Sequence, residues 1–268
     1  MQRPDVRKNL RRGVYIVPTL FTMLNIFFGF RSIVNSMRAV QAITAGQHDR
    51  AIAAFEIACV SLLIAAIFDT FDGLVARQLG ATSEFGKEYD SLADVVTFGC
   101  APAVLVYAWG LQPLGKLGVG IAFLFLVSVS LRLARFNVMT GKSDYRYFVG
   151  LPSPAGALTI GAIIYYAPAP VLDRRFAIVI LILTACTAFA MVSPIRWRAQ
   201  KGINFQQGRS LMYVVVLAAI VAVGFAWPRP FGLVLALSYL ASGPLARLWS
   251  IAFPSRKTDD VFESGITN

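Results

Sequence analysis

Charged side chains are scarce in this chain, and their scarcity is the first guide to its class. Only 15% of the 268 residues are Asp, Glu, Lys or Arg, whereas 57% are hydrophobic. A soluble domain carries more charge than this composition provides. Long apolar runs separated by short polar segments instead predict an all-α, polytopic membrane protein whose helices form a bundle.

Cysteine and histidine are also rare, which argues against disulfide frameworks and against metal sites built from these residues. Cys59, Cys100 and Cys186 lie within apolar runs at no metal-ligand spacing, so they are interpreted as small packed side chains. The single histidine, His48, falls in a short polar loop and is expected to be solvated. We detect no internal repeat and no second domain. We expect no cleavable signal peptide, because basic residues precede the first apolar run without a convincing cleavage site.

The apolar runs predict about eight membrane-spanning helices. Their approximate positions are 14–37, 51–77, 87–111, 113–136, 151–169, 175–195, 209–227 and 230–252. A basic segment, 1–13, precedes them and is expected in the cytoplasm. The tail, 254–268, is predicted to be cytoplasmic and disordered, which leaves 14–253 as one transmembrane catalytic domain.

The net charge of +11 is explained better by membrane topology than by nucleic-acid binding, because the basic residues cluster in short loops between apolar runs. With the N-terminus in the cytoplasm, 18 of the 25 Lys and Arg residues fall in cytoplasmic segments and 6 in outer segments. This asymmetry predicts an orientation that places residues 77–87 at the cytoplasmic side of the membrane.

Four aspartates gather around that segment. Asp69 and Asp72 are three residues apart, and Asp90 and Asp94 are four apart, so each pair shares one face of a helix. A carboxylate costs roughly 2.5–3.5 kcal/mol near a membrane centre on insertion scales, so four facing one spot need cations. Hard divalent cations prefer carboxylate oxygens, and two of them suit a displacement at phosphorus.

The complete pattern resembles the signature of the CDP-alcohol phosphotransferase family without a gap or substitution. It reads Asp69-x2-Asp72-Gly73-x2-Ala76-Arg77-x8-Gly86-x3-Asp90-x3-Asp94. The resemblance implies a family-like helical core and a reaction in which the hydroxyl of an alcohol displaces CMP from a CDP-linked alcohol.

The resemblance also implies roles for the motif residues. The metal ligands would be Asp69, Asp72, Asp90 and Asp94, holding two ions of Mg²⁺ or Mn²⁺, with Asp94 also acting as the catalytic general base. The nucleotide and diphosphate would contact Asp69, Gly73, Ala76, Arg77 and Gly86. Gly73 would let the nucleotide approach the backbone closely, and the guanidinium of Arg77 suits a diphosphate. A homodimer is also implied.

Other segments resemble the bacterial phosphatidylserine synthases within that family. They are YIVPTLFTMLNIFFGF, SLADVVTFGCAPA, LRLARFN and YFVGLPSPAGA, and they cover roughly residues 11–158. One departure is Thr19, which follows Pro18 where many relatives have asparagine. This likeness implies transfer of a phosphatidyl group from CDP-diacylglycerol to L-serine, with release of CMP, in the cell inner membrane.

Two alternatives remain open at this stage. Another member of the family would use glycerol 3-phosphate, inositol phosphate or choline as the acceptor. A cation transporter, from a different class, would also place aspartates within the membrane. It would need carboxylates near mid-membrane and a polar path to both sides. Here the carboxylates lie one to three turns from the cytoplasmic helix ends, and no matching polar path leads outward.

A cation is expected to hold the carboxylate of serine. Arg135, with Arg132 three residues earlier on the same helix face, is the first hypothesis. Lys142 or Arg146 in the following loop could do this instead. The alternative is that these cations only fix topology and bind anionic headgroups.

A second pair of charges is predicted in the outer half of the membrane. Arg31 and Glu56 lie on adjacent antiparallel spans, at depths that agree within roughly 2 Å at 1.5 Å per residue. Such charges usually pair, so a structural ion pair is one hypothesis. Separate extension of each side chain to the interface is the other.

Overall fold

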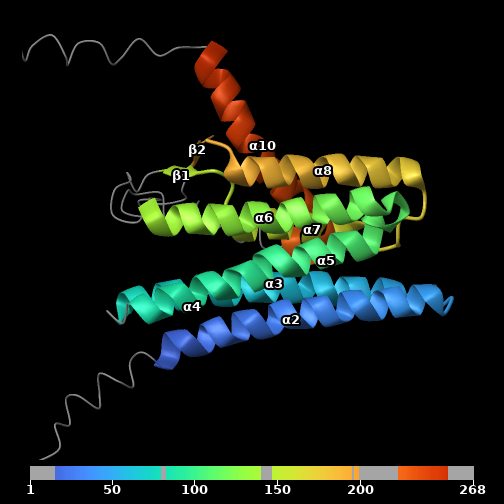
Figure 1. Ribbon diagram of the computed structural model, residues 1–268, viewed down its shortest axis with the longest axis horizontal. Coiled ribbons are helices and arrows are strands. Elements are labelled where there is room, and N and C mark those ends of the chain that lie inside the picture. Colours follow the sequence, from blue (N-terminus) through green and yellow to red (C-terminus); the bar gives the residue numbers. More distant parts are fainter. Residues whose placement is uncertain (1–15, 80–82, 140–146, 195, 199–222, 253–268) are drawn as a thin grey trace, which may run out of the picture.

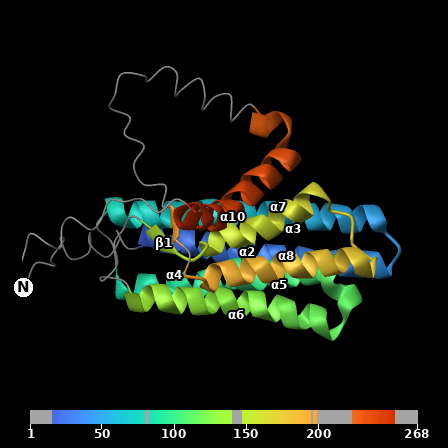
Figure 2. The ribbon, with the colours of Figure 1, turned by 90° about the horizontal axis from the view of Figure 1, so that it is seen from above.

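The computed structural model describes residues 16–79, 83–139, 147–194, 196–198 and 223–252, and these form a bundle of long helices (Figure 1, Figure 2). The α-helices are α2 (Ile16–Thr44), α3 (His48–Gln78), α4 (Glu84–Asp94), α5 (Ala101–Val106), α6 (Lys116–Met139), α7 (Ser153–Tyr166), α8 (Arg174–Val192) and α10 (Pro228–Ala252). Two short antiparallel strands, β1 (Tyr147–Val149) and β2 (Arg196–Arg198), pair beside the bundle. The prediction of a helical bundle is confirmed.

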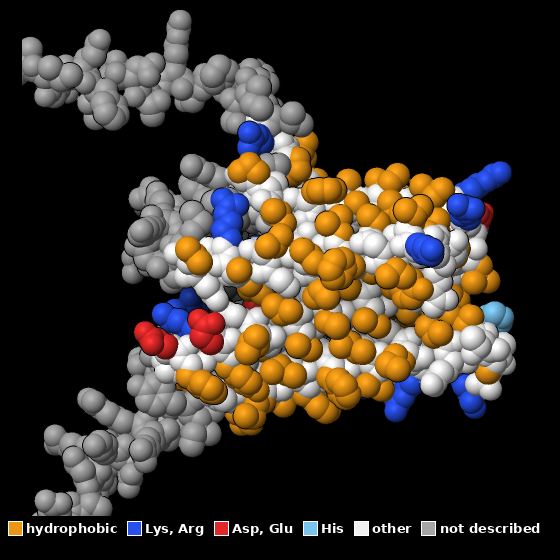
Figure 3. Space-filling view, in the orientation of Figure 1, with side chains coloured by type: hydrophobic (Ala, Val, Ile, Leu, Met, Phe, Trp, Pro, Cys, Tyr) orange, Lys and Arg blue, Asp and Glu red, His pale blue; other side chains and the backbone are white. Residues whose placement is uncertain are grey.

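Five helical segments of the described chain have the length and apolar composition of membrane spans. They are Pro18–Thr44, His48–Gln78, Glu84–Leu114, Lys116–Val138 and Arg174–Val192. In Figure 3, apolar side chains cover the middle of the molecule and charged ones gather at its two ends. The chain is therefore an integral membrane protein.

The remaining three predicted spans are not among these five segments. The fifth corresponds to α7, whose 14 residues extend about 21 Å, less than the roughly 30 Å of a hydrocarbon core. The eighth corresponds to α10. Most of the seventh, 209–227, lies outside the described residues, as do the predicted basic segment 1–13 and the tail 254–268.

The third span is not a uniform α-helix. After α4 it continues through a π-helical turn, η1 (Val95–Cys100), then α5, a second π-helical turn, η2 (Tyr107–Leu111), and a 3-10 turn, η3 (Gln112–Leu114). Turns of π-helix occur mostly as isolated bulges, often at functional sites. Here η1 begins at the residue after Asp94. It therefore changes the direction in which the following side chains point but leaves the spacing of the aspartates on α4 unaltered.

Helix α2 packs closely against the helices that carry the four aspartates. α2 packs along α3 and also contacts α4 and η1. Gly29 makes this possible, since a Cβ there would lie 2.5 Å from Thr97 Oγ1 and 2.9 Å from Thr97 Cα. The Thr97 hydroxyl in turn donates to the Asn25 carbonyl at 3.3 Å. The approach thus depends on a residue without a side chain.

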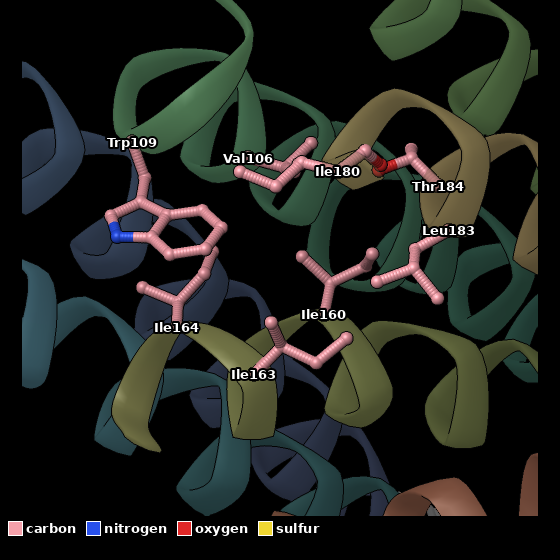
Figure 4. Close-up of a pocket in the computed structure, with 8 residues that line it drawn as sticks. All are labelled: Val106, Trp109, Ile160, Ile163, Ile164, Ile180, Leu183 and Thr184. Carbon is pink, nitrogen blue, oxygen red and sulfur yellow. The ribbon is translucent and has the colours of Figure 1, made fainter. Parts of the chain in front are cut away.

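A small apolar pocket lies among η2, α5, α7 and α8, and Figure 4 shows its lining. Its one polar side chain, Thr184, donates to the Ile180 carbonyl within its own helix. Trp109 forms one wall, and its indole N–H lies 3.1 Å and 2.9 Å from the carbonyls of Ala167 and Ala169. With its polar groups already engaged, this pocket belongs to the packed core.

The predicted pair between Arg31 and Glu56 is wrong. Glu56 instead accepts a hydrogen bond and forms an ion pair with Arg229 at the start of α10. Arg229 also lies over the Tyr165 ring, 5.6 Å from its centroid. Arg31 lies 6.0 Å from the centroid of the Phe28 ring and is exposed. A helix distant in sequence, α10, supplies the cation that contacts Glu56.

Gly29→Ala is expected to destabilise the protein by about 1–3 kcal/mol, because the added methyl forces backbone apart at the α2–η1 contact. Gly120→Ala is the matched control: it lies within helix α6 and its Cβ would meet nothing within 4 Å. The control is expected to be neutral or to stabilise by up to about 1 kcal/mol. Thermal unfolding of the detergent-purified variants measures both, and equal melting temperatures would contradict the packing role of Gly29.

Candidate active site

Three of the four aspartates converge at one point. One carboxylate oxygen each from Asp69, Asp72 and Asp90 lies within 4.8 Å of the others. The first two come from the last turns of α3, and the third comes from the middle of α4. Asp94, one turn further along α4, is close enough to interact electrostatically with the other three.

The start of α4 is fixed by its own sequence. Ser83 caps the helix, and its hydroxyl accepts a hydrogen bond from the Gly86 backbone N–H at 2.9 Å. A Cβ at Gly86 would lie 3.0 Å from that same hydroxyl oxygen. Gly86 therefore has a structural reason to be glycine, because a side chain would crowd the cap that sets where Asp90 falls.

The carboxylates are withdrawn from solvent. Asp72 is 5% exposed and Asp94 is 9% exposed. Among the described residues no basic side chain lies within 4.0 Å of any of the four, since Glu56–Arg229 is the one such ion pair found there. Four adjacent acidic groups without a contacting cation form an unfavourable arrangement unless positive charge is added.

The arrangement fits a bound divalent cation. Asp90 Oδ1 and Asp94 Oδ1 are buried and have no hydrogen-bond partner among the described residues. The side-chain hydroxyl of Thr22 lies 3.1 Å from Asp72 Oδ2, so it can donate to one oxygen of the cluster. Buried oxygens with free lone pairs, gathered within 4.8 Å, are the ligands that Mg²⁺-like cations select.

An open cleft adjoins the cluster between α2, α3 and α4. Its cavity volume is about 260 Å³, near the lower end of the range of small-molecule sites. The lining residues are Pro18, Thr19, Thr22, Asp72, Gly73, Ala76, Arg77, Ser83, Gly86, Lys87, Tyr89 and Asp90. A Cβ at Gly73 would meet no atom within 4 Å, so a side chain there would project into free space beside Asp72.

Most of the sequence-predicted residues thus lie together. Asp72, Gly73, Ala76, Arg77, Gly86 and Asp90 share the cleft, and Asp69 joins them through the carboxylate cluster. Thr22 and Tyr89 also line the cleft but carry no role in the motif. Thr22 lies in a first-span segment already singled out by its resemblance, but its contact with Asp72, 50 residues away, leaves no local signal in the sequence.

The two arginines proposed for serine occupy different environments. Arg132 is partly buried on α6, donates from Nη1 to the Ser153 hydroxyl at 2.8 Å and interacts electrostatically with Asp94. Arg135 is exposed, and no interaction with the aspartates is found for it. The other two candidates, Lys142 and Arg146, lie outside the described residues.

Comparison with known proteins identifies a family and relatives whose sequences match this chain. The sequence model of the CDP-alcohol phosphatidyltransferase family matches residues 15–192. A CDP-diacylglycerol–serine O-phosphatidyltransferase from Mycobacterium leprae is 33% identical, over 96% of this chain and 84% of its own length.

Two further relatives match over a shorter segment. A protein of the same name from Helicobacter pylori strain J99 is 38% identical over 55% of this chain, and the match spans only about half, 56%, of that relative. An archaetidylserine synthase from Methanothermobacter thermautotrophicus is 36% identical over 54% of this chain and 56% of its own length. With the family model covering well over half of the sequence, the chain belongs to the CDP-alcohol phosphatidyltransferase family.

Proposed function

We propose that the protein transfers the phosphatidyl group of CDP-diacylglycerol to the hydroxyl of L-serine and releases CMP. The observation that carries the proposal is the convergence of Asp69, Asp72 and Asp90 beside a cleft that also contains two cations. Such a site suits a substrate with a diphosphate, since cations and donors can neutralise the charge that develops during phosphoryl transfer.

The nucleotide end of the donor lies in the cleft. Arg77 and Lys87 line it and supply positive charge for the diphosphate. The free space beside Gly73 lets the nucleotide approach the α3 backbone. Phe71 and Leu74 on the same helix are 49% and 41% exposed, so they offer the acyl chains an apolar exit to the bilayer.

The chemical step is a displacement at phosphorus. The serine hydroxyl oxygen forms a new P–O bond with the phosphatidyl phosphorus. The bond between that phosphorus and the bridging diphosphate oxygen breaks, and its electron pair leaves with CMP. The hydroxyl proton passes to a carboxylate oxygen of Asp94, which is buried and has no hydrogen-bond partner among the described residues.

Asp69, Asp72 and Asp90, with Asp94 at the edge of the cluster, would hold two divalent cations, Mg²⁺ or Mn²⁺. When bound, such cations neutralise the diphosphate and polarise the phosphorus. The Thr22 hydroxyl, 3.1 Å from Asp72 Oδ2, helps to hold that carboxylate in place.

Serine as the acceptor is supported by the names of the relatives, which share serine, whereas the lipid they name differs. The proposed setting is the inner membrane, with the cleft facing the cytoplasm, as the asymmetry of basic residues favours. We also propose that residues 14–253 form one catalytic domain and that the enzyme is a homodimer, which rests on the family resemblance.

The acceptor is tested by measuring CMP release from CDP-diacylglycerol by purified protein with Mg²⁺ or Mn²⁺. L-Serine is expected to be the best acceptor in a panel with glycerol 3-phosphate, inositol phosphate and choline, and the lipid product should be phosphatidylserine. Faster release with another alcohol would identify a different transferase of the family. Absence of CMP release with every acceptor, together with metal-dependent ion flux in vesicles, would favour the transporter alternative.

Asp94→Asn is expected to lower kcat by about 10²–10⁴-fold, because the amide cannot accept the hydroxyl proton. Glu88→Gln is the matched control, since it removes an exposed acidic group from the same helix. Its kcat should stay within about twofold of wild type. Wild-type turnover by Asp94→Asn would remove the assignment of Asp94 as the base.

Mg²⁺ or Mn²⁺ is expected to raise the thermal unfolding temperature in the absence of substrate, since saturation to a hundred times the dissociation constant adds about 2.7 kcal/mol. Asp72→Asn and Asp90→Asn should lose this rise, whereas Glu88→Gln should keep it. Without metal, both Asn variants are expected to equal or exceed wild-type stability, because repulsion among the carboxylates is relieved. An undiminished rise in Asp72→Asn would place the cation elsewhere.

A further inference from the structure

The cleft contains an aromatic side chain that neither the sequence motif nor the displacement step involves. Tyr89 on α4 is the one aromatic residue among the described residues that line the cleft. It is partly buried and immediately precedes Asp90. Gly86 lies three residues earlier, on the same face of the helix and in the same cleft, and it adds no side chain there. The cleft therefore has a flat apolar surface next to one of its carboxylates.

A second ring supports Tyr89. Phe85, one turn earlier on α4, stacks on it with the ring planes 4° apart and the centroids 6.0 Å apart. Parallel rings at this separation are within the range of favourable aromatic pairs. Phe85 is 73% exposed and does not line the cleft, so its ring restricts the orientation of Tyr89 without occupying the space of a ligand.

The other cleft residues divide into an apolar and a charged set. Pro18 and Thr19 line the cleft from α2, which contacts α4. Arg77 and Lys87 supply the cations that suit a diphosphate. A ligand that is anionic at one end and has a flat ring at the other matches this division, and a nucleotide is such a ligand.

An interfacial anchor is the ordinary role of aromatic residues near the ends of membrane helices. That role accounts for Phe85, whose ring is exposed. It does not account for Tyr89, whose ring is partly buried and lines a cleft between three helices. A nucleobase is the chemical group that uses such a ring, because every base presents a π face on which an aromatic side chain can stack.

We propose that Tyr89, supported by Phe85, is the stacking surface for the nucleobase of the donor. This inference rests on the proposed function and adds the residue that binds the base. The base lies on the Tyr89 ring, with Pro18 on the α2 wall of the cleft. The diphosphate lies toward Arg77, Lys87 and the aspartate cluster.

The test compares CMP with ribose 5-phosphate, which keeps the sugar and the phosphate but lacks the base. Affinities of the full-length, detergent-purified protein are measured with Mg²⁺ by calorimetric titration of CMP and by its displacement with ribose 5-phosphate. Tyr89→Leu is expected to weaken CMP binding by about fivefold to hundredfold, which corresponds to the loss of one stacked base. Its affinity for ribose 5-phosphate should stay within about twofold of wild type.

Two further variants separate the ring from the hydroxyl and from its support. Tyr89→Phe keeps the ring and should bind CMP within about threefold of wild type. Phe85→Leu should weaken CMP binding by about twofold to fivefold, because Tyr89 is then held less firmly. Tyr166→Leu is the matched control, since it removes a tyrosine that is 51% exposed at the end of α7 and does not line the cleft. It should bind CMP as wild type does.

Turnover gives a second readout. Tyr89→Leu should raise the KM for CDP-diacylglycerol by about the factor found for CMP and leave the KM for L-serine within about twofold of wild type. Unchanged CMP affinity in Tyr89→Leu would assign the ring to the membrane interface and refute the proposal. Equal weakening of CMP and ribose 5-phosphate would also refute it, since the ring would then only maintain the fold of the cleft.

Failure of the proposed function gives a different result. A wild-type protein that binds CMP through Tyr89 but transfers the phosphatidyl group to another alcohol would keep the stacking surface and lose serine as the acceptor. A wild-type protein that binds no CMP would remove both. If Tyr89→Phe loses as much CMP affinity as Tyr89→Leu, the hydroxyl makes the contact, and stacking is refuted while the proposed function stands.

Discussion

The cost of placing four carboxylates among apolar helices governs this structure. Each charge is unfavourable in a membrane, and neighbouring like charges increase the cost. The protein limits it by placing the aspartates at the ends of α3 and in α4, beside an open cleft, instead of at mid-span. The cluster is thus an incomplete structural unit, because its buried oxygens retain free lone pairs. Because the aspartate cluster destabilises the fold when no cation is bound, a cation that binds there can stabilise the fold strongly.

Different helices flank that cluster on its two sides. α2 closes one side, and its close approach at Gly29 brings Thr22 within 3.1 Å of Asp72. α6, α7 and α10 close the other side, where Arg132 supplies a cation near Asp94 but not in contact with it. Basic side chains therefore lie near the aspartates from two directions, Arg77 and Lys87 in the cleft and the partly buried Arg132 on α6.

Local patterns in the sequence were sufficient for the helices and for the motif. Hydropathy located the ends of most described spans within about three residues, but α2 continues seven residues beyond the predicted end at 37, to Thr44. Fixed spacing identified the residues that gather around the cleft. What failed depended on contacts between distant segments. Spacing placed Arg132 and Arg135 on one helix face, whereas α6 leaves Arg132 partly buried and Arg135 exposed. Depth alone paired Glu56 with the wrong arginine, because the position of α10, which brings Arg229 to it, leaves no periodic signal. Thr22 was missed for the same reason, since its partner is 50 residues away.

The ion pair between Glu56 and Arg229 bears on where this protein can be divided. The segment matched by the family model ends at residue 192, before α10 begins. A chain cut there would keep the acidic member of the pair within the membrane and discard its cation, and it would expose the face of α7 against which α10 packs. The shared family segment therefore packs against a helix that lies outside the matched region, although the sequence signature lies entirely in the N-terminal half.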